Sequence, residues 1–502
     1  MLTTLAAPAF AKTWYIEDGD ITVKASDTGN DVTQKDKTTY GDKDTIITNR
    51  KEDASSNTVT IEAEKKDDKV EVTLKDVNID TSSRKKAAVS VTGEGDTNIK
   101  LNGDNALKSD IYRSGIYGSG SGSLTISGGE NDSLTAQGGS GANGISSSGS
   151  LTISGGTITA NGDDGGSGIY SRGGVTISGG STVTANGGNG NSGGDGICSS
   201  GGVSISGGTV TANGGNSTGS YGSGGDGIRS DGGVTISGGT VTAAGGDSKD
   251  GYGGDGIRSG GGVTISGNTV NAAGGNGGNV GGYGICSFDR VAISGGTVEA
   301  AGGSSGSSNG GSGIYSNDID LSGSLELTAK AGSPNGKALS QKGSELVLDT
   351  IKDKLGPGAK VTATDADGKV IDQVPIPRPV EPEEPVIPEE SSSSSDGGSA
   401  APSAPAFSLP GLTVTDKDGQ RISYTSTQSG NTLTVCVGRL TASFRISLAA
   451  LRQLRAEGIE TITFQTILCS TTLSVDELLA MGGEDAEAVL THRFTDSSLT
   501  VG

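Results

Sequence analysis

The chain has 502 residues, of which 90 are glycine, and only 3% of its residues are aromatic. Its formal net charge is −21 and its pI is about 4.5, which argues against nucleic acid or an anionic membrane as a partner, because like charges repel. So few large side chains would make a poor single globular core, whereas a stacked repeat needs only a thin column of Val, Ile and Leu. No apolar run reaches the roughly 18 residues of a membrane span, so we expect no membrane insertion.

Residues 1–11 resemble the end of a secretory signal peptide. The stretch from Leu2 to Phe10 is mostly small and apolar, and Ala9-Phe10-Ala11 fits an A-x-A cleavage site before Lys12. The basic region that normally opens such a signal is missing, so we interpret this segment as a remnant. It predicts a secreted, extracellular protein, either free or associated with the cell surface.

Residues 12–110 are more charged and less regular, yet they contain short apolar patches that alternate with polar residues. Alternation of this kind favours strands, so we expect an N-terminal cap followed by degenerate rungs of a β-helix. The patches are Thr58–Ile61, Val70–Leu74, Val77–Ile79, Ala88–Val91 and Ile99–Leu101.

Residues 111–374 are organised by one repeated pattern. A Gly-Ile step recurs with its isoleucine at positions 116, 145, 169, 197, 228, 257, 285 and 314, so the spacings are 29, 24, 28, 31, 29, 28 and 29 residues. A period in this range is typical of stacked repeat architectures. The fullest repeat continues with Val234-Thr235-Ile236-Ser237 and Thr240-Val241-Thr242, whose alternation favours strands, and glycine pairs separate the patches.

Three strands and three corners in about 28 residues predict one rung of an all-β, parallel β-helix. Val234 and Ile236 should point inward, and neighbouring rungs should be roughly 4.8 Å apart. Each inward residue should then stack on its equivalents in the adjacent repeats, which are Val203, Ile205, Val263 and Ile265. We expect the last rungs to use the alternating patches Ile319–Leu321, Leu325–Leu327, Leu346–Leu348 and Val361–Ala363.

A Pro- and Ser-rich linker is predicted at residues 375–405, and a small α+β module at 406–502. In the module, Leu448 to Glu457 has the pattern of an amphipathic helix that ends at Gly458. Ser474 is expected to cap a second, short helix. The remaining apolar patches of the module alternate and favour strands.

The four cysteines lie two in the repeats and two in the C-terminal module. Cys198 and Cys286 follow the Gly-Ile isoleucine three rungs apart, or roughly 14 Å, which is too far for a disulfide. Cys436 and Cys469 lie in expected strands of the module, and the sequence leaves their pairing open. His492 is the only histidine, so no Ser-His-Asp or Cys-His arrangement is available, and we expect no catalytic set, metal site or cofactor.

Charged residues recur at two positions of the repeat. Asp195, Asp226 and Asp255 precede the Gly-Ile step, and Arg229 and Arg258 follow it. Stacking would bring the carboxylates together, and such carboxylates could hold calcium or act as a general acid and base. The alternative is a row of solvated turn aspartates that the arginines partly neutralise.

Aromatic and threonine side chains also recur. Tyr221, Tyr252 and Tyr283 lie in successive loops and offer faces on which a sugar could stack, although their spacing from the Gly-Ile step varies. The alternative is that they pack on the solenoid. Four consecutive repeats carry a Thr-x-Thr pattern similar to the ice-binding face of β-solenoid antifreeze proteins, but threonine is also a common strand residue. The four are Thr157–Thr159, Thr182–Thr184, Thr209–Thr211 and Thr240–Thr242.

The run Val70–Leu107, followed by GIYGSGSGSLTISGG, resembles bacterial secreted proteins described as carbohydrate-binding domain-containing. The resemblance covers roughly residues 45–330. It implies a right-handed parallel β-helix that is secreted or surface-exposed in gut-type Gram-positive bacteria, and it transfers no defined site.

On this basis we expect an extracellular carbohydrate-binding or adhesin-like protein that is not an enzyme. Its partner would be a glycan or a host or bacterial surface polysaccharide. The site hypothesis comprises the three tyrosines, the three aspartates and the two arginines. Two alternatives remain open: a polysaccharide-degrading β-helix enzyme, whether lyase or glycosidase, and a structural surface stalk.

Overall fold

The computed structural model divides the chain into two compact units, Met1–Pro385 and Val386–Gly502. The signal remnant at 1–11 and the expected linker after Pro375 lie outside the described residues. The described residues are 12–307, 309–375, 411–416, 421–422, 424–429, 431–437, 442–466, 470–482, 486–492 and 497–501.

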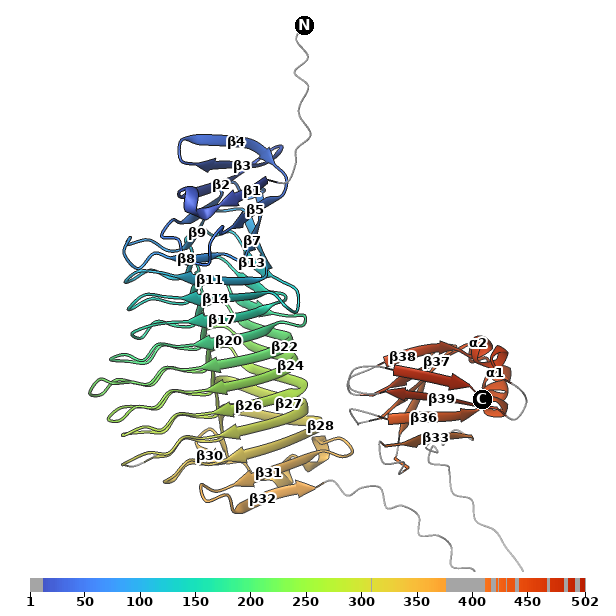
Figure 1. Cartoon of the computed structure of the whole chain (residues 1–502). Coiled ribbons are helices and arrows are strands. Elements are labelled where there is room, and N and C mark those ends of the chain that lie inside the picture. Colours follow the sequence, from blue (N-terminus) through green and yellow to red (C-terminus); the bar gives the residue numbers. More distant parts are fainter. Residues whose placement is uncertain are drawn as a thin grey trace, which may run out of the picture. The chain divides into compact units, whose positions relative to one another are not determined.

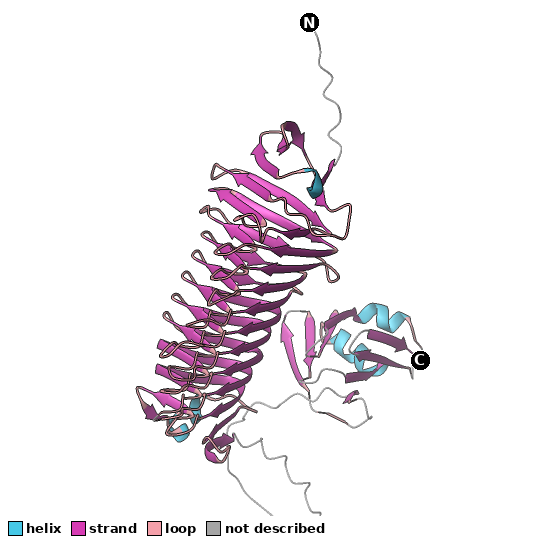
Figure 2. Ribbon diagram, turned by 60° about the vertical axis from the view of Figure 1, so that its left-hand side comes forward, coloured by secondary structure: helices cyan, strands magenta, loops and turns pink. Residues whose placement is uncertain are grey.

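The first unit is a parallel β-helix of about 13 turns, as the repeat predicts. Its rungs stack along one axis (Figures 1 and 2). The strands form three columns, in which each strand pairs with its equivalent in the next rung.

The first column carries the Gly-Ile step of the repeat. It comprises β2 (Ile21–Ser26), β6 (Val59–Ala63), β9 (Val89–Gly93), β12 (Ile116–Gly118), β15 (Ile145–Ser147), β18 (Ile169–Ser171), β21 (Ile197–Ser199), β23 (Ile228–Ser230), β25 (Ile257–Ser259), the starts of β27 (Ile285–Ala301) and β28 (Ile314–Lys330), and β29 (Leu339–Gln341).

The second and third columns carry the Val-Thr-Ile and Thr-Val-Thr patches, and in later rungs one long strand spans both. The second column comprises β1 (Lys12–Tyr15), β5 (Thr45–Thr48), β7 (Lys69–Lys75), β10 (Asp96–Asn102), β13 (Leu124–Ser127), β16 (Leu151–Ile153), β19 (Val175–Ile177), β22 (Val203–Asn213), β24 (Val234–Ala244) and β26 (Val263–Ala273), then β27 and β28. The third comprises β8 (Asn78–Asp80), β11 (Asp104–Lys108), β14 (Ser133–Gln137), β17 (Thr157–Asn161) and β20 (Thr182–Asn186), then β22, β24, β26, β27, β28 and β31 (Lys360–Thr364).

The core is the stack of inward aliphatic side chains. Ile236 faces Ile205 in one neighbouring rung and Ile265 in the other, and all three are 0% exposed. Val234 lies between Val203 and Val263 in the same way. The predicted register is therefore confirmed. Full burial of each such side chain stabilises the fold by roughly 1.5–3 kcal/mol, so the energy is spread evenly along the axis.

Antiparallel strands lie at both ends of the column. At the start, β2 turns back into β3 (Gly29–Gln34) and β4 (Lys37–Asp42). At the far end, β31 pairs antiparallel with β32 (Val370–Pro375), and β29 with β30 (Ser344–Glu345). These pairings cover strand edges that would otherwise be exposed at the ends of a parallel stack.

The expected strand at Leu346–Leu348 is wrong. Leu348 instead begins the 3-10 helix η2 (Leu348–Thr350), which is followed by η3 (Lys352–Lys354). The side chain of Leu348 is fully buried, and its main-chain N–H donates to Asp372 at 3.0 Å. Burial of the Leu348 side chain and the hydrogen bond from its main chain to Asp372 therefore take the place of strand pairing here.

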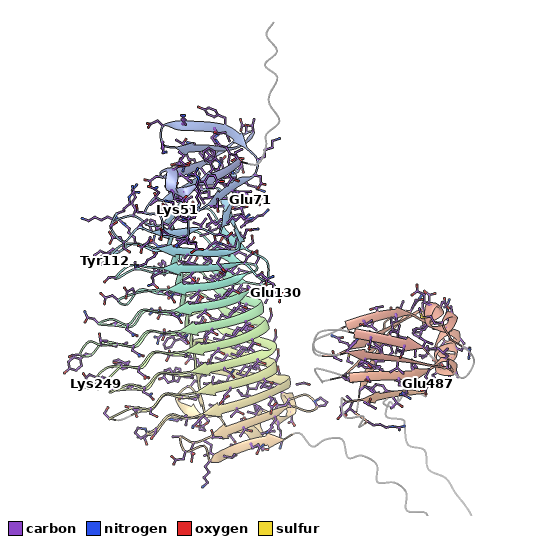
Figure 3. All side chains as sticks on the ribbon, viewed as in Figure 1. Lys51, Glu71, Tyr112, Glu130, Lys249 and Glu487 are labelled. Carbon is purple, nitrogen blue, oxygen red and sulfur yellow. The ribbon has the colours of Figure 1, made fainter. Side chains whose placement is uncertain are left out.

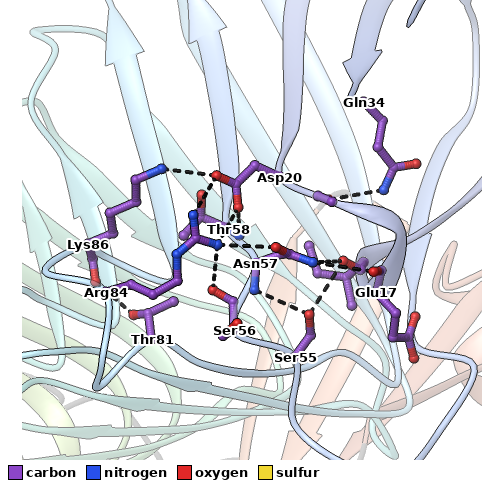
Figure 4. A network of polar contacts seen from close by, with 12 residues as sticks. Glu17, Asp20, Gln34, Ser55, Ser56, Asn57, Thr58, Thr81, Arg84 and Lys86 are labelled. Carbon is purple, nitrogen blue, oxygen red and sulfur yellow. Dashed lines mark hydrogen bonds and ion pairs between the residues drawn. The ribbon is translucent and has the colours of Figure 1, made fainter. Parts of the chain in front are cut away.

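The N-terminal rungs are joined by ion pairs rather than by aliphatic stacking alone (Figure 4). Arg84 donates to both carboxylate oxygens of Asp20, at 2.8 and 3.0 Å, and also to Asn57. Lys86 adds a third donor to Asp20 at 3.0 Å. Before this network lies the 3-10 helix η1 (Ile16–Asp18).

The second unit is a small α+β module, as predicted, with two four-stranded sheets. Phe444 and Phe464 come from different sheets and their ring centroids lie 4.9 Å apart, so the sheets share one core. One sheet comprises β33 (Leu412–Thr415), β36 (Ala442–Ser447), β39 (Glu487–His492) and β40 (Ser497–Val501); the other comprises β34 (Thr425–Ser429), β35 (Thr432–Cys436), β37 (Thr461–Gln465) and β38 (Ser470–Ser474).

The module has two helices, α1 (Leu448–Ala456) and α2 (Val475–Ala480), close to their predicted bounds. The hydroxyls of Ser447 and Ser474 cap them by accepting main-chain N–H groups. Gly458 adopts φ +93 just after α1, as a terminating glycine does. Within the described ranges, neither helix nor any other is long and apolar enough to cross a membrane.

Candidate functional site

Long loops project from one edge of the β-helix, between the third-column strand of each rung and the first-column strand of the next (Figure 1). Figure 3 places Lys249 near the tip of one of these loops and Tyr112 on the same edge. A groove of about 900 Å³ follows the base of the loops from Gly165 to Gly343. It crosses the rungs of seven first-column strands, from β18 to β29.

Glycine allows the loops to stack this closely. A Cβ atom on Gly254 would lie 1.9 Å from the carbonyl oxygen of Gly225, and one on Gly225 would lie 1.9 Å from that of Gly194. No real Cβ approaches main-chain oxygen to this distance, so side chains are sterically excluded from this row. The glycine content of the repeat therefore shapes one boundary of the groove.

The predicted aspartate column exists and is held by hydrogen bonds to the main chain. Asp195 accepts the N–H of Asp226 at 2.8 Å, Asp226 accepts that of Asp255 at 2.7 Å, and Asp255 accepts that of Tyr283 at 2.7 Å. Asp226 and Asp255 are only 7% and 3% exposed. These are not the solvated turn aspartates of the alternative interpretation.

Burial raises the pKa of all three carboxyl groups, because water no longer solvates the charged form. The pKa of Asp226 is raised most clearly, since Asp255 and Asp195 add repulsion on either side of it. The pKa of Asp195 is raised by burial, against the opposing effects of its main-chain hydrogen bond and the charge of Arg229. In the groove the protonated form of these carboxyl groups is therefore more favoured than it is in water.

The arginine column lies three residues further along each repeat, and the structure stacks it as predicted. Cys198, Arg229, Arg258, Cys286 and Tyr315 face one another in successive rungs. Arg258 forms an ion pair with Asp255 at 3.2 Å and lies 5.4 Å from the ring centroid of Phe288. Arg229 is exposed and makes no ion pair or side-chain hydrogen bond with the described residues.

The three predicted tyrosines do not share one surface. Tyr252 and Tyr283 line the groove. Tyr221 is 81% exposed and lines a different hollow, with Lys249 and Asp250. The segment that follows Tyr221 is longer: this tyrosine lies 7 residues before its Gly-Ile isoleucine, against 5 for Tyr252 and 2 for Tyr283.

The sequence prediction missed two aromatic residues: Tyr315, which lines the far part of the groove, and Phe288, which contacts Tyr315. Tyr315 stacks on Tyr283 with ring centroids 4.9 Å apart, and Phe288 meets Tyr315 edge-on at 6.5 Å. The signal for Tyr315 was present, because it follows the Gly-Ile step at the same position as Arg229. Tyr283 likewise occupies the position of the aspartates, one rung beyond Asp255.

Cys198 and Cys286 are free thiols three rungs apart, as the spacing requires. Burial raises the pKa of the Cys198 thiol to about 12, and the pKa of the Cys286 thiol is raised as well. Both are therefore inert at neutral pH. Cys436 is also a free thiol, and Cys469 lies outside the described residues.

The threonine rows are in register as expected, with Thr182 facing Thr157 and Thr209, and Thr209 facing Thr240. Asn271 and Glu299 interrupt the second row. Among the described residues, no group of three or more His, Cys, Asp or Glu side chains could hold a metal ion.

Three segments match the family model described as Beta helix repeat: residues 151–169, 203–228 and 234–257. The chain carries β-helix repeats. The matched segments supply β16, β17, β18, β22, β23, β24 and β25 in whole or in part, within or beside the rungs that form the groove. No curated protein and no solved structure matches the chain.

Proposed function

We propose that this protein binds carbohydrate in the groove along its loop edge and acts as a non-catalytic binder or adhesin. The observation that carries the proposal is the run of carboxyl, guanidinium and tyrosine side chains that repeats from rung to rung along one continuous groove. A solenoid presents the same contact at regular intervals, which suits a ligand that is itself a repeating chain.

The chemistry of the groove fits a sugar. Aromatic faces such as those of Tyr252 and Tyr283 can pack against the apolar face of a pyranose ring, and charged groups can hydrogen-bond its hydroxyls. The groove spans six rung-to-rung steps, or about 29 Å at the usual strand spacing, which is long enough for several linked sugars.

A surface glycan as partner is consistent with a protein that acts outside the cell. We therefore propose a secreted or cell-surface location as well. The module at 411–501 would position or attach the β-helix, and its fold identifies no ligand.

A polysaccharide-degrading enzyme is the second candidate, and one observation favours it. Asp226 lies between Asp195 and Asp255 in the groove, and burial together with these two neighbours raises its pKa. A carboxyl group that keeps its proton can act as a general acid in glycosidic cleavage. An enzyme would release reducing ends or unsaturated products from a bound polysaccharide, and Asp226→Asn would abolish that release.

A glycan array and a polysaccharide pull-down with the full chain test the proposal. Tyr252→Ala should lose about fivefold or more in affinity, because a fully engaged aromatic stack contributes roughly 1–3 kcal/mol. Tyr221→Ala is the matched control, since Tyr221 lies in a loop outside the groove. Absence of binding to every glycan would overturn the proposal and leave a structural stalk.

A further inference from the structure

Two arginines face each other on adjacent rungs inside the groove. Arg229 and Arg258 are register partners of the parallel strands β23 and β25, so their Cα atoms are about 4.8 Å apart. Like charges at directly opposite positions of neighbouring strands repel and destabilise the pair. Something must compensate this repulsion if both side chains remain in the groove.

A direct ion pair offsets this repulsion on one side only, because Arg229 has just the longer-range attraction of Asp195. Arg258 has Asp255 as its ion-pair partner and the ring of Phe288 beside it. Arg229 has neither, and within the described part of the chain it forms no ion pair. Its guanidinium is exposed at the groove with a second cation one rung away, so a bound anion would relieve the repulsion.

The aspartates below do not supply that anion. One oxygen of each carboxyl group is engaged by a main-chain N–H of the next rung, at 2.7 to 2.8 Å. Asp226 and Asp255 are also almost fully buried and form the floor of the groove, and Asp195 attracts Arg229 without forming an ion pair with it. The guanidinium of Arg229 is therefore what the groove presents at this rung.

A third cation lies further along the same groove. Lys337 occupies the position of the aspartates at the last rung, because its carbonyl oxygen accepts the N–H of Gly313 just as that of Asp255 accepts the N–H of Gly227. Four rung steps separate it from Arg229, or about 19 Å. Tyr252, Tyr283 and Tyr315 line the groove between them.

We propose that the ligand is an acidic polysaccharide, and that Arg229 and Arg258 together hold the carboxylate of one of its sugars. This inference rests on the proposed glycan binding and adds the class of sugar. Guanidinium groups form paired, charge-assisted hydrogen bonds with carboxylates, which neutral sugars cannot accept in the same way. The tyrosines provide the stacking contacts for the neighbouring units, and Lys337 holds a second acidic group.

The chain as a whole carries −21 charges, so long-range attraction does not bring an acidic polymer to the groove. Recognition is local, and salt has two opposing effects on it. Added salt screens the general repulsion and also weakens the contact of the exposed Arg229. Experiments at one fixed, physiological ionic strength keep these effects constant.

The test compares matched polymers on the full chain. Polygalacturonate, alginate and hyaluronan are titrated beside their carboxyl-reduced forms, which keep the backbone and lose the charge. Arg229→Gln is compared with Arg172→Gln, because Arg172 is also an exposed arginine at the end of a first-column strand but does not line the groove. Both variants remove one positive charge from the surface.

We expect at least one acidic polymer to bind about tenfold or more tightly than its reduced form, and Arg229→Gln to lose that preference while Arg172→Gln keeps it. Binding of acidic and reduced forms alike, unaffected by Arg229→Gln but lost in Tyr252→Ala, would overturn the acidic ligand and leave glycan binding intact. Preference lost equally in both arginine variants would also overturn it, because the effect would then be one of net charge. No binding to any polymer would overturn both proposals.

Discussion

Asp226 accepts the main-chain N–H of Asp255 from the next rung at 2.7 Å. Asn143 makes the same bond to the N–H of Ser167, also at 2.7 Å, at the equivalent position of an earlier repeat. Where this hydrogen bond is made, the position therefore requires a short side chain with a carbonyl-type oxygen and not a negative charge. The hydrogen bond does not require the charge that Asp195, Asp226 and Asp255 can carry, and a buried charge lowers the stability of the folded protein.

Asp226→Asn should stabilise the β-helix at neutral pH. The amide oxygen preserves the bond to Asp255, and the substitution removes a buried group whose pKa is raised in the folded state. Chemical denaturation followed by circular dichroism at pH 7 and near pH 3.5 would measure the effect. A variant less stable than the wild type at pH 7 would show that the ionised carboxylate is itself stabilising.

The raised pKa of Asp226 also determines how the stability of the β-helix changes with pH. Below the ordinary aspartate pKa of 3.8, both folded and unfolded states are protonated, so Asp226 imposes no penalty. As pH rises above 3.8, the unfolded chain loses its proton first and the wild type loses stability until the raised folded pKa is passed. The advantage of Asp226→Asn should therefore vanish on acidification.

Gly254→Ala should disrupt the stacking of the loops beside the groove. Its Cβ would lie 1.9 Å from a main-chain oxygen of the adjacent rung, so the backbone must move, at a cost of about 3 kcal/mol or more. Gly180→Ala is the control, because nothing lies within 4 Å of its Cβ position and its φ is not positive, so stability should be unchanged or raised by up to about 1 kcal/mol. Equal effects in denaturation midpoints would refute close stacking of the glycines.

Ile236→Ala should lower the free energy of unfolding by about 2–5 kcal/mol, because it opens a cavity between Ile205 and Ile265. Thr242→Ala lies on the outer side of the same rung and should cost less than about 1 kcal/mol. Urea denaturation of the two variants measures the difference. A small loss for Ile236→Ala would mean that the aliphatic stack contributes less than its burial indicates.

Tyr315→Ala should weaken glycan binding although Tyr315 is only one member of a stacked pair. Its removal leaves Tyr283 without the ring that lies 4.9 Å away and removes the edge contact with Phe288. A loss of about twofold to thirteenfold is expected, since such aromatic pairs contribute about 0.5–1.5 kcal/mol. Titration of the best-binding glycan, with Tyr221→Ala in parallel, checks this.

Much of the fold could be predicted because one rung repeats. The Val-x-Ile and Gly-Ile steps determine the register of Ile236 with Ile205 and Ile265 without any knowledge of the loops. The end of the column could not be predicted in the same way. At Leu346–Leu348 the alternation suggested a strand, but Leu348 is buried by a 3-10 turn whose partner, Asp372, is distant in sequence.

The candidate site was predicted in part for the same reason. Aspartates and arginines at fixed repeat positions had to stack, whereas Tyr221 lies in a loop of irregular length and is not brought to the groove. Burial of Asp226 depends on the loops that cover it, and residue spacing does not encode that depth. The place of Tyr315 in the arginine column could have been predicted from the Gly-Ile step alone.

The most direct test of carbohydrate binding is a crystal structure of the full chain with the oligosaccharide that binds best. If the groove binds carbohydrate as proposed, sugar density will lie along the solenoid axis at the base of the loops, in contact with Tyr252 and with Arg229. Density on the threonine rows, on the module, or nowhere on the loop edge would contradict carbohydrate binding in the groove, even if binding in solution were strong.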